Sequence, residues 1–232
     1  MKTERQNKNL LAEIIGRIGK KFGGRLIVGL MIAVGFLLFF GWLAEEVFEG
    51  ETRMFDESVR NFVHGFAAPP LTALMKFFSF VGSPLFLVIT GAIVVAVLLY
   101  LKHKRAVVLF LITMVGEIAL NLAFKLFFGR ARPDAFFDYP LPSSYSFPSG
   151  HAFGSLCFFG ILAWLAAARV FGKRTKIAIG VATFLLIFFI GLSRIYLGVH
   201  YPSDVIAGYA AGLFWVGVVA LTDMHLRERN DD

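Results

Sequence analysis

Three short polar segments interrupt a largely apolar chain, and they carry the side chains that could do chemistry. They are residues 125–134 (KLFFGRARPD), 148–151 (PSGH) and 193–204 (SRIYLGVHYPSD). Together they hold cations, two histidines and carboxylates, but no Cys, His or carboxylate cluster has the spacing of metal ligands. We therefore predict chemistry that uses no metal and no other cofactor.

The cations of these segments suit a phosphate group. Lys125, Arg132 and Arg194 supply ammonium and guanidinium donors, which bind tetrahedral oxyanions through charge-assisted hydrogen bonds. The backbone amides of Ser149 and Gly150 stand just before an apolar run, where the start of a helix would direct them at the same anion. We predict that these five residues bind the phosphate of a substrate.

The two histidines and one carboxylate could transfer that phosphate. His200 and Asp204 are four residues apart, so a helix that begins near Pro202 would place both side chains on one face. A carboxylate bonded to one ring nitrogen fixes the tautomer and leaves the other nitrogen free to attack phosphorus. His151 is then the candidate general acid that protonates the leaving oxygen.

Each element taken alone has an ordinary structural explanation. Pro-Ser-Gly is common in turns, and a single Arg or Lys beside an apolar run usually anchors a helix at the membrane interface. A single His near a helix end is more often structural than catalytic. The combined prediction therefore depends on whether the three segments lie on the same side of the molecule.

The composition indicates that lipid is the solvent of this chain. Hydrophobic residues make up 57% of the 232 positions and charged residues only 17%. A soluble domain is about 45–50% apolar with Gly included. The same figures exclude disordered, collagen-like and coiled-coil chains. The single Cys157 lies within an apolar run, where we expect it to be a packing residue.

Six apolar runs predict an all-α integral membrane protein. Each run approaches the ~17–25 residues that a helix needs to cross a bilayer, and together they predict a bundle of six transmembrane helices with short interfacial helices. The runs cover residues 26–44, 84–101, 106–124, 152–168, 177–192 and 205–222.

The distribution of Lys and Arg predicts the orientation of the bundle. Sixteen of these residues fall in the N-terminal segment, the loops after the second and fourth runs and the tail, whereas seven fall on the other side. The positive-inside rule then places both termini in the cytoplasm and all three polar segments on the extracytoplasmic face of the cell membrane. The net charge of +7 thus reflects topology, and we predict no nucleic-acid partner.

Outside the apolar runs, the chain divides into a few segments. Residues 1–25 form a cytoplasmic segment that is partly amphipathic. At 10–22 it has the pattern of a helix on the inner leaflet or, equally, of an extension of the first span. Residues 26–83 hold the first span and, at 55–80, two short helices separated near Pro69 and Pro70, which either cover the site or merely connect two spans. Residues 84–222 form a five-helix catalytic core, and residues 223–232 a cytoplasmic tail.

Several polar residues are candidates for a supporting role around the site. Glu117, Asn121 and Lys125 step by four along the third run and would form one polar stripe, which either lines a polar cavity or joins helices by hydrogen bonds. Other candidates adjoin the three segments or lie within them: Arg130, Asp134 and Ser193. The Gly208-x-x-x-Gly212 pattern predicts close helix packing within the bundle.

The three segments resemble the signature of the type 2 phosphatidic acid phosphatase superfamily, in particular its bacterial membrane lipid phosphatases. That signature is K-x(6)-RP, PSGH and SR-x(5)-H-x(3)-D, and the resemblance covers about residues 84–222. Every fixed position of the signature is matched: Lys125, Arg132, Pro133, Pro148, Ser149, Gly150, His151, Ser193, Arg194, His200 and Asp204.

The resemblance implies an all-helical core and metal-independent hydrolysis of phosphomonoesters or diphosphates through a phosphohistidine. It implies that His200 is the nucleophile, that Asp204 orients it and that His151 is the acid. The expected partners are a phosphorylated lipid substrate and membrane lipids, with no obligate protein partner. We slightly favour undecaprenyl diphosphate as substrate, because carrier recycling leaves diphosphate at an extracytoplasmic site, and phosphatidylglycerophosphate or phosphatidic acid is the alternative.

Two other classes of function are considered. Vanadate-dependent haloperoxidases share this type of oxyanion pocket by family resemblance, but those relatives are soluble and larger. A noncatalytic lipid-binding or transport protein would not need His151, His200 and Asp204 together. We therefore expect a membrane lipid phosphatase.

Overall fold

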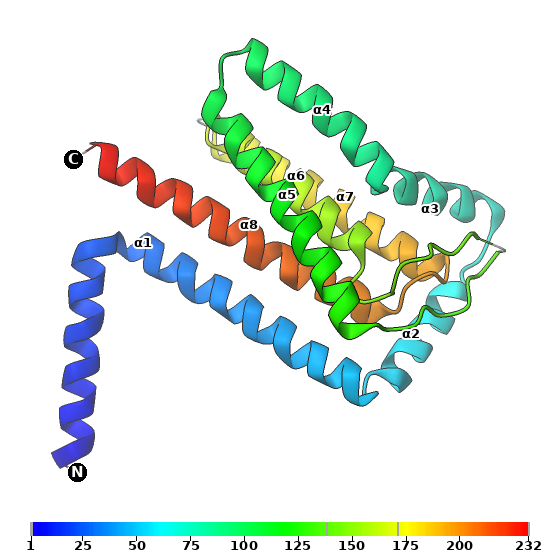
Figure 1. The fold of residues 1–232 in the computed structure, drawn as a ribbon, viewed down its shortest axis with the longest axis horizontal. Helices are drawn as coiled ribbons and strands as arrows, with labels where there is room; N and C mark the ends of the chain where they lie inside the picture. The colour runs from blue at the N-terminus through cyan, green and yellow to red at the C-terminus, as the bar shows by residue number, and fades with distance from the viewer. Residues whose placement is uncertain (1, 138, 171, 232) are drawn as a thin grey trace.

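The structure is a computed structural model that describes residues 2–137, 139–170 and 172–231, without the side chains of 2–23, 25 and 228–231. Its described residues form eight helices and no strand (Figure 1). The helices are α1 (Lys2–Glu49), α2 (Arg53–His64), α3 (Pro69–Val81), α4 (Pro84–Tyr100), α5 (Lys104–Phe128), α6 (Gly150–Ala167), α7 (Lys173–Tyr196) and α8 (Pro202–Asp231).

The helices confirm the predicted all-α membrane architecture. All six apolar runs are helical, and five helices are long and apolar enough to cross a membrane by themselves. The exception is α4, whose 17 residues are short for a bilayer. It meets α3 at an angle of 51° at Gly82 and Ser83, and such a bent pair has the geometry of a broken span or of a re-entrant loop. The hydropathy pattern alone does not reveal this bend.

The two short helices expected in residues 55–80 are present as α2 and α3. The chain leaves helix at residues 65–68, and α3 begins at Pro69, whose fixed φ suits the first turn of a helix. The apolar residues that made α2 recognisable are largely exposed, because Phe55, Phe62 and Phe66 are 48%, 69% and 60% accessible. The opposite face of α2 is therefore the one that packs on the protein.

The N-terminal part of α1 stands away from the other helices, whereas its later part runs beside α8 (Figure 1). Residues 10–22 are helical and continuous with the first span. The side chains of 10–22, on which the amphipathic prediction depends, lie outside the described residues.

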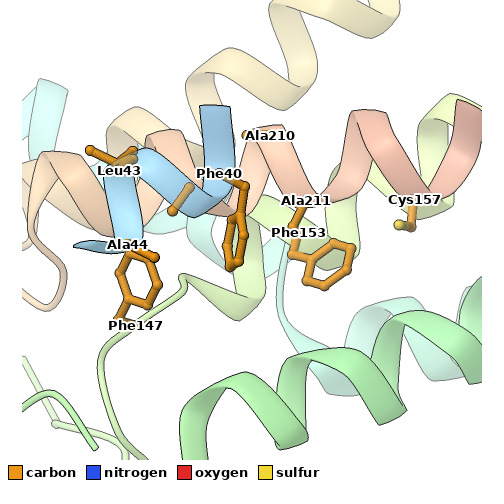
Figure 2. Packing of buried hydrophobic residues seen from close by; sticks show 9 residues of the cluster. Phe40, Leu43, Ala44, Phe147, Phe153, Cys157, Ala210 and Ala211 are labelled. Carbon is orange, nitrogen blue, oxygen red and sulfur yellow. The ribbon is translucent and has the colours of Figure 1, made fainter. Parts of the chain in front are cut away.

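A hydrophobic core joins α1, α6 and α8 below the polar segments. Phe40, Phe147 and Phe153 pack together there, and Cys157 is fully buried beside them (Figure 2). This confirms Cys157 as a packing residue. Because Phe147 precedes the PSGH segment directly, its burial fixes where that segment enters α6.

Close packing of α6 on α8 depends on two glycines. A Cβ atom on Gly208 would lie 2.8 Å from the main-chain oxygen of Ser149, and one on Gly212 would lie 2.9 Å from a methyl group of Leu156. The Gly208-x-x-x-Gly212 pattern thus serves packing within the bundle, as predicted. It also brings the start of α6 against the first turns of α8.

We predict that Gly208→Ala destabilises the protein, because the neighbouring backbone at Ser149 can yield little to the added methyl group. The expected loss is about 1–3 kcal/mol, as for other overpacked sites, and thermal unfolding in detergent measures it. Gly35→Ala is the matched control, since no atom lies within 4 Å of a Cβ atom at that position. Equal melting temperatures for the two variants would show that the α6–α8 contact tolerates a side chain.

Candidate active site

The fold brings all three polar segments together at one end of the bundle. The loop after α5 carries Arg132, whose Nη1 lies 3.0 Å from Nε2 of His200 in the turn before α8. The start of α6 joins the same group, because the backbone N–H of Ser149 donates to the main-chain oxygen of Asp204 at 2.9 Å. The convergence that the sequence required is therefore present, and α2 and α3 lie at the same end (Figure 1).

His200 and Asp204 form the predicted pair at the first turn of α8. The helix begins at Pro202, and Nδ1 of His200 lies 3.2 Å from Oδ2 of Asp204. The same oxygen accepts from the backbone N–H of Tyr201 at 2.9 Å. This is the capping-box hydrogen bond, in which an acidic side chain at the third helical position accepts from the N-cap residue. Asp204 thus caps its own helix while it holds the histidine.

The contacts of His200 specify its tautomer. A guanidinium can only donate, so the Arg132 contact requires Nε2 to be an acceptor with a free lone pair. Nδ1 then carries the proton and donates it to Asp204. This is the arrangement in which Nε2 is the nucleophilic nitrogen.

His200 is only 2% exposed, and this burial controls its protonation. Burial lowers the pKa of His200 to about 3, and the hydrogen bond and charge of Asp204 offset only part of that effect. The imidazole is therefore neutral at physiological pH, as a nucleophile must be.

The Asp204 carboxylate receives two further side chains. Ser146 donates its hydroxyl to Oδ2 at 2.5 Å, and Arg130 donates from Nη1 to Oδ1 at 2.6 Å. Arg130 was a candidate from sequence, whereas Ser146 was missed. A second missed residue is Asp56 of α2, which accepts from the other end of Arg130 at 2.8 Å. The sequence feature that could have indicated Asp56 is its spacing from Arg60. The two residues are four positions apart, which places them on one face of α2, away from the exposed phenylalanines.

Lys125 and Arg132 are held by the segment before α6. Nζ of Lys125 donates to the main-chain oxygen of Tyr145 at 2.5 Å, and Nε of Arg132 donates to that of Ser144 at 2.8 Å. Burial, followed by the nearby charge of Arg194, lowers the pKa of Arg132 to about 10, so the guanidinium remains charged at neutral pH. Among the described residues, neither cation forms a salt bridge with a carboxylate, so main-chain oxygens orient both.

Arg194 is buried near the end of α7 and reaches toward α3. Its Nη1 donates to the hydroxyl of Ser79, and its guanidinium lies 5.6 Å from the ring centre of Tyr139. Its Nε has no hydrogen-bond partner among the described residues. Ser79 and Tyr139, which position this cation, were not identified from sequence because neither lies in the motifs.

The structure corrects the prediction for the Ser149 amide. Its N–H donates to Asp204 rather than pointing to an anion, because the close approach at Gly208 brings α6 against α8. The Ser149 hydroxyl caps α6 by accepting from the N–H of Ala152 at 3.5 Å. Gly150 opens α6, and a Cβ atom there would lie 2.8 Å from the Asn121 amide nitrogen. Glycine is therefore needed where α5 meets the start of α6.

The remaining candidates divide into two groups. Asn121 donates to Glu117 at 3.2 Å on α5, and both residues line the cavity described below, which favours a polar cavity wall for this stripe. Ser193 instead donates within its own helix to Ile190, and Asp134 is exposed, with its main-chain oxygen accepting from Arg60.

A cavity of about 760 Å³ connects these polar groups to the membrane-spanning region. Its polar end contains Lys125, Arg132, His151 and His200. Its remaining wall is contributed mainly by α4 and α5 and, apart from Glu117 and Asn121, is largely apolar: Leu87, Val88, Val95, Phe110, Leu111 and Met114. Such a cavity can hold an anionic head group at one end and a hydrocarbon chain along its wall.

No group of three or more His, Cys, Asp or Glu side chains that could hold a metal was found among the described residues. The cations at the polar end are the groups available to stabilise phosphate charge.

We predict that acid destabilises this protein partly through His200. An unfolded histidine has a pKa of about 6.5, above the folded value of about 3. The unfolded state therefore binds the extra proton, and stability is lost as the pH falls from about 6.5 toward 3, by about 2 kcal/mol at pH 5.

The measurement is the melting temperature in detergent at pH 7 and pH 5. His200→Asn should show a smaller fall between the two values than the parent protein. An equal fall in both proteins would contradict a neutral, buried His200.

Comparison with known proteins identifies the family of this site. Residues 106–227 match the sequence model of the PAP2 superfamily, which is about half of the chain. Phosphatidylglycerophosphatase B of Bacillus subtilis is 28% identical over 181 residues, covering 78% of this chain and 89% of the relative. An undecaprenyl-diphosphatase of Sulfolobus acidocaldarius is 31% identical over 134 residues, covering 55% and 60%.

Two solved structures resemble most of the fold. The crystal structure of a transmembrane PAP2-type phosphatidylglycerolphosphate phosphatase from Bacillus subtilis aligns with a TM-score of 0.77 at 27% identity, covering 83% of this chain and 96% of that one. Aquifex aeolicus LpxE aligns with a TM-score of 0.57 at 25% identity, covering 72% and 95%. The chain therefore belongs to the PAP2 superfamily, and it is a multi-pass membrane phosphatase that hydrolyses phosphoric esters.

Proposed function

We propose that this enzyme hydrolyses a lipid phosphate or diphosphate through a phosphohistidine formed on His200. The observation that carries the proposal is the state of His200. Its Nδ1 is held by Asp204, and its Nε2 lone pair points to Arg132 at the polar end of the cavity. A neutral imidazole with one nitrogen fixed and the other beside an anion-binding cation is suited to attack phosphorus.

When the substrate binds, its phosphate oxygens replace protein atoms as hydrogen-bond acceptors of the cations. Lys125, Arg132 and Arg194 bind the phosphate, together with Ser149 and the Gly150 N–H at the start of α6. The Arg132 guanidinium donates to Nε2 of His200, so a phosphate oxygen must take over that guanidinium before attack. Binding of the anion and exposure of the nucleophile are thus the same event.

Phosphoryl transfer then takes place in two steps. Nε2 of His200 forms a bond to phosphorus while the bond to the leaving oxygen breaks, and His151 gives its proton to that oxygen. Water next attacks the phosphohistidine, His151 takes a proton from it, and the P–N electron pair returns to Nε2 as inorganic phosphate leaves. Asp204 stabilises the positive charge of the imidazole between the two steps.

The lipid part of the substrate fits the apolar wall of the cavity, which α4 and α5 form. We also propose that the site lies at the extracytoplasmic edge of the cell membrane with both termini in the cytoplasm, which the distribution of Lys and Arg among the loops supports. Undecaprenyl diphosphate remains our slightly favoured substrate, and phosphatidylglycerophosphate or phosphatidic acid is the alternative. The names of the relatives include both prenyl and glycerolipid phosphatases. No obligate protein partner is required by this mechanism.

We predict that His200→Ala lowers kcat by about 10⁴-fold or more, since removal of a nucleophile disables the whole catalytic unit. Phosphate release from a lipid phosphate in detergent with a metal chelator present is the measurement. His103→Ala, at an exposed residue before α5, is the control and should retain the parent rate. Parent-like hydrolysis by His200→Ala would refute the mechanism.

The substrate preference has its own test. Specificity constants on purified undecaprenyl diphosphate, phosphatidylglycerophosphate and phosphatidic acid, compared side by side, should be highest for undecaprenyl diphosphate. A higher value for either glycerolipid would overturn that preference and leave the chemistry at His200 untouched.

A further inference from the structure

The most highly satisfied buried carboxylate outside the proposed catalytic residues is Asp56 on α2. It is fully buried and accepts three kinds of donor. Oδ1 accepts from the backbone N–H of Ser203 at 2.9 Å, and Oδ2 accepts from the Ser203 hydroxyl at 2.7 Å and from Arg130 Nη2 at 2.8 Å. Since Ser203 directly precedes Asp204, Asp56 lies behind the first turn of α8.

Arg130 connects Asp56 to the proposed catalytic pair. Its Nη2 donates to Asp56, and its Nη1 donates to Oδ1 of Asp204 at 2.6 Å. The guanidinium also lies 4.1 Å from the ring centre of Tyr201, which covers one face and limits its rotation. One planar, doubly donating side chain therefore spans two buried carboxylates, a geometry that Lys cannot reproduce.

The sharing of one cation has an electrostatic consequence for His200. Burial alone lowers the pKa of Arg130, but the charges of Asp204 and Asp56 outweigh it and raise that pKa above its usual value. The positive charge of Arg130 is shared between Asp56 and Asp204. Arg130 therefore offsets only part of the negative charge of Asp204. Its Oδ2 keeps negative charge for the Nδ1 proton of His200, where positive charge develops during attack.

We propose that Asp56 is a positioning residue for phosphoryl transfer, which acts on the His200–Asp204 pair through Arg130. The inference rests on the proposed role of His200 as nucleophile. It also assigns a purpose to α2, which precedes the matched residues 106–227: this helix supplies a carboxylate that completes the support of the site.

The test is Asp56→Asn, which keeps the shape of the side chain and removes its charge. We expect kcat to fall about 10- to 100-fold, the size found when outer groups that orient metal ligands are removed. KM should change less than about 3-fold, because Asp56 bonds to Ser203 and Arg130 and to none of the proposed phosphate-binding residues. Two controls lie on α2. Glu57→Gln breaks only the exposed pair with Arg53. Arg60→Gln removes the contacts of α2 with the main-chain oxygens of Asp134 and Gly198 and with one side of the Tyr201 ring, but Arg60 bonds to neither Asp56 nor Arg130.

Both controls should retain kcat within about 3-fold of the parent. If Arg60→Gln lost as much kcat as Asp56→Asn, the activity would depend on the packing of α2 against the bundle and not on the Asp56–Arg130 bridge. That result would overturn the proposal. A lowered melting temperature in Asp56→Asn with parent kcat per folded molecule would overturn it too.

A double-mutant cycle with Arg130→Gln separates action through Arg130 from an independent effect. The double variant should have the kcat of Arg130→Gln alone, because the amide oxygen of Asn can still accept from the Ser203 N–H and the bridge is the interaction that both changes break. Multiplied losses would contradict the proposal. Arg130→Lys keeps the charge but cannot span both carboxylates, so kcat should fall as it does in Asp56→Asn. This variant tests the proposal if Asp56→Asn does not fold.

His200→Ala, assayed in parallel, separates failure of the proposed function from failure of this inference. Full activity of His200→Ala refutes the nucleophile, whereas loss of its activity together with a normal kcat for Asp56→Asn refutes this inference alone.

Discussion

The fully buried carboxylate of Asp204 is the constraint on which the geometry of the site depends. A buried charge is tolerated only when it is paired and hydrogen-bonded, and here the donors come from separate parts of the chain. Tyr201 and His200 are local, whereas Ser146 and Arg130 come from the loop between α5 and α6. The hydrogen bonds of the Asp204 carboxylate therefore form only when that loop lies against the start of α8.

A main-chain hydrogen bond also fixes the start of α6 against the start of α8. The oxygen of Asp204 accepts from the N–H of Ser149, and Gly208 allows that close approach of α6 to α8. The position of His151, one residue beyond Gly150, is thereby fixed relative to His200. Lys125 and Arg132, held by main-chain oxygens of the segment before α6, complete a polar end whose opposite wall is hydrocarbon. An amphiphilic cavity of this kind matches a phosphorylated lipid better than a soluble phosphate.

Much of this arrangement follows from local rules that the sequence contains. Pro202 starts α8, the four-residue step from His200 to Asp204 places them together, and the runs of apolar residues predict the helices. The partners that depend on packing were not predictable in the same way. Asp56 is 74 residues from Arg130. The shared face of Asp56 and Arg60 on α2 does not by itself indicate which loop that face meets once the bundle is assembled. The use of the Ser149 amide by Asp204 likewise depends on how closely α6 and α8 approach.

The most direct test of the central claim is to trap the covalent intermediate. A lipid phosphate labelled with ³²P in the phosphate that is released should, after acid-free denaturing quench within a single turnover, leave label on the protein that is stable to alkali and labile to acid. Peptide mapping should place that label on His200, and His200→Ala protein should carry none. Complete turnover by the parent protein with no protein-bound label at any time, or label of the same kind in His200→Ala, would contradict the account.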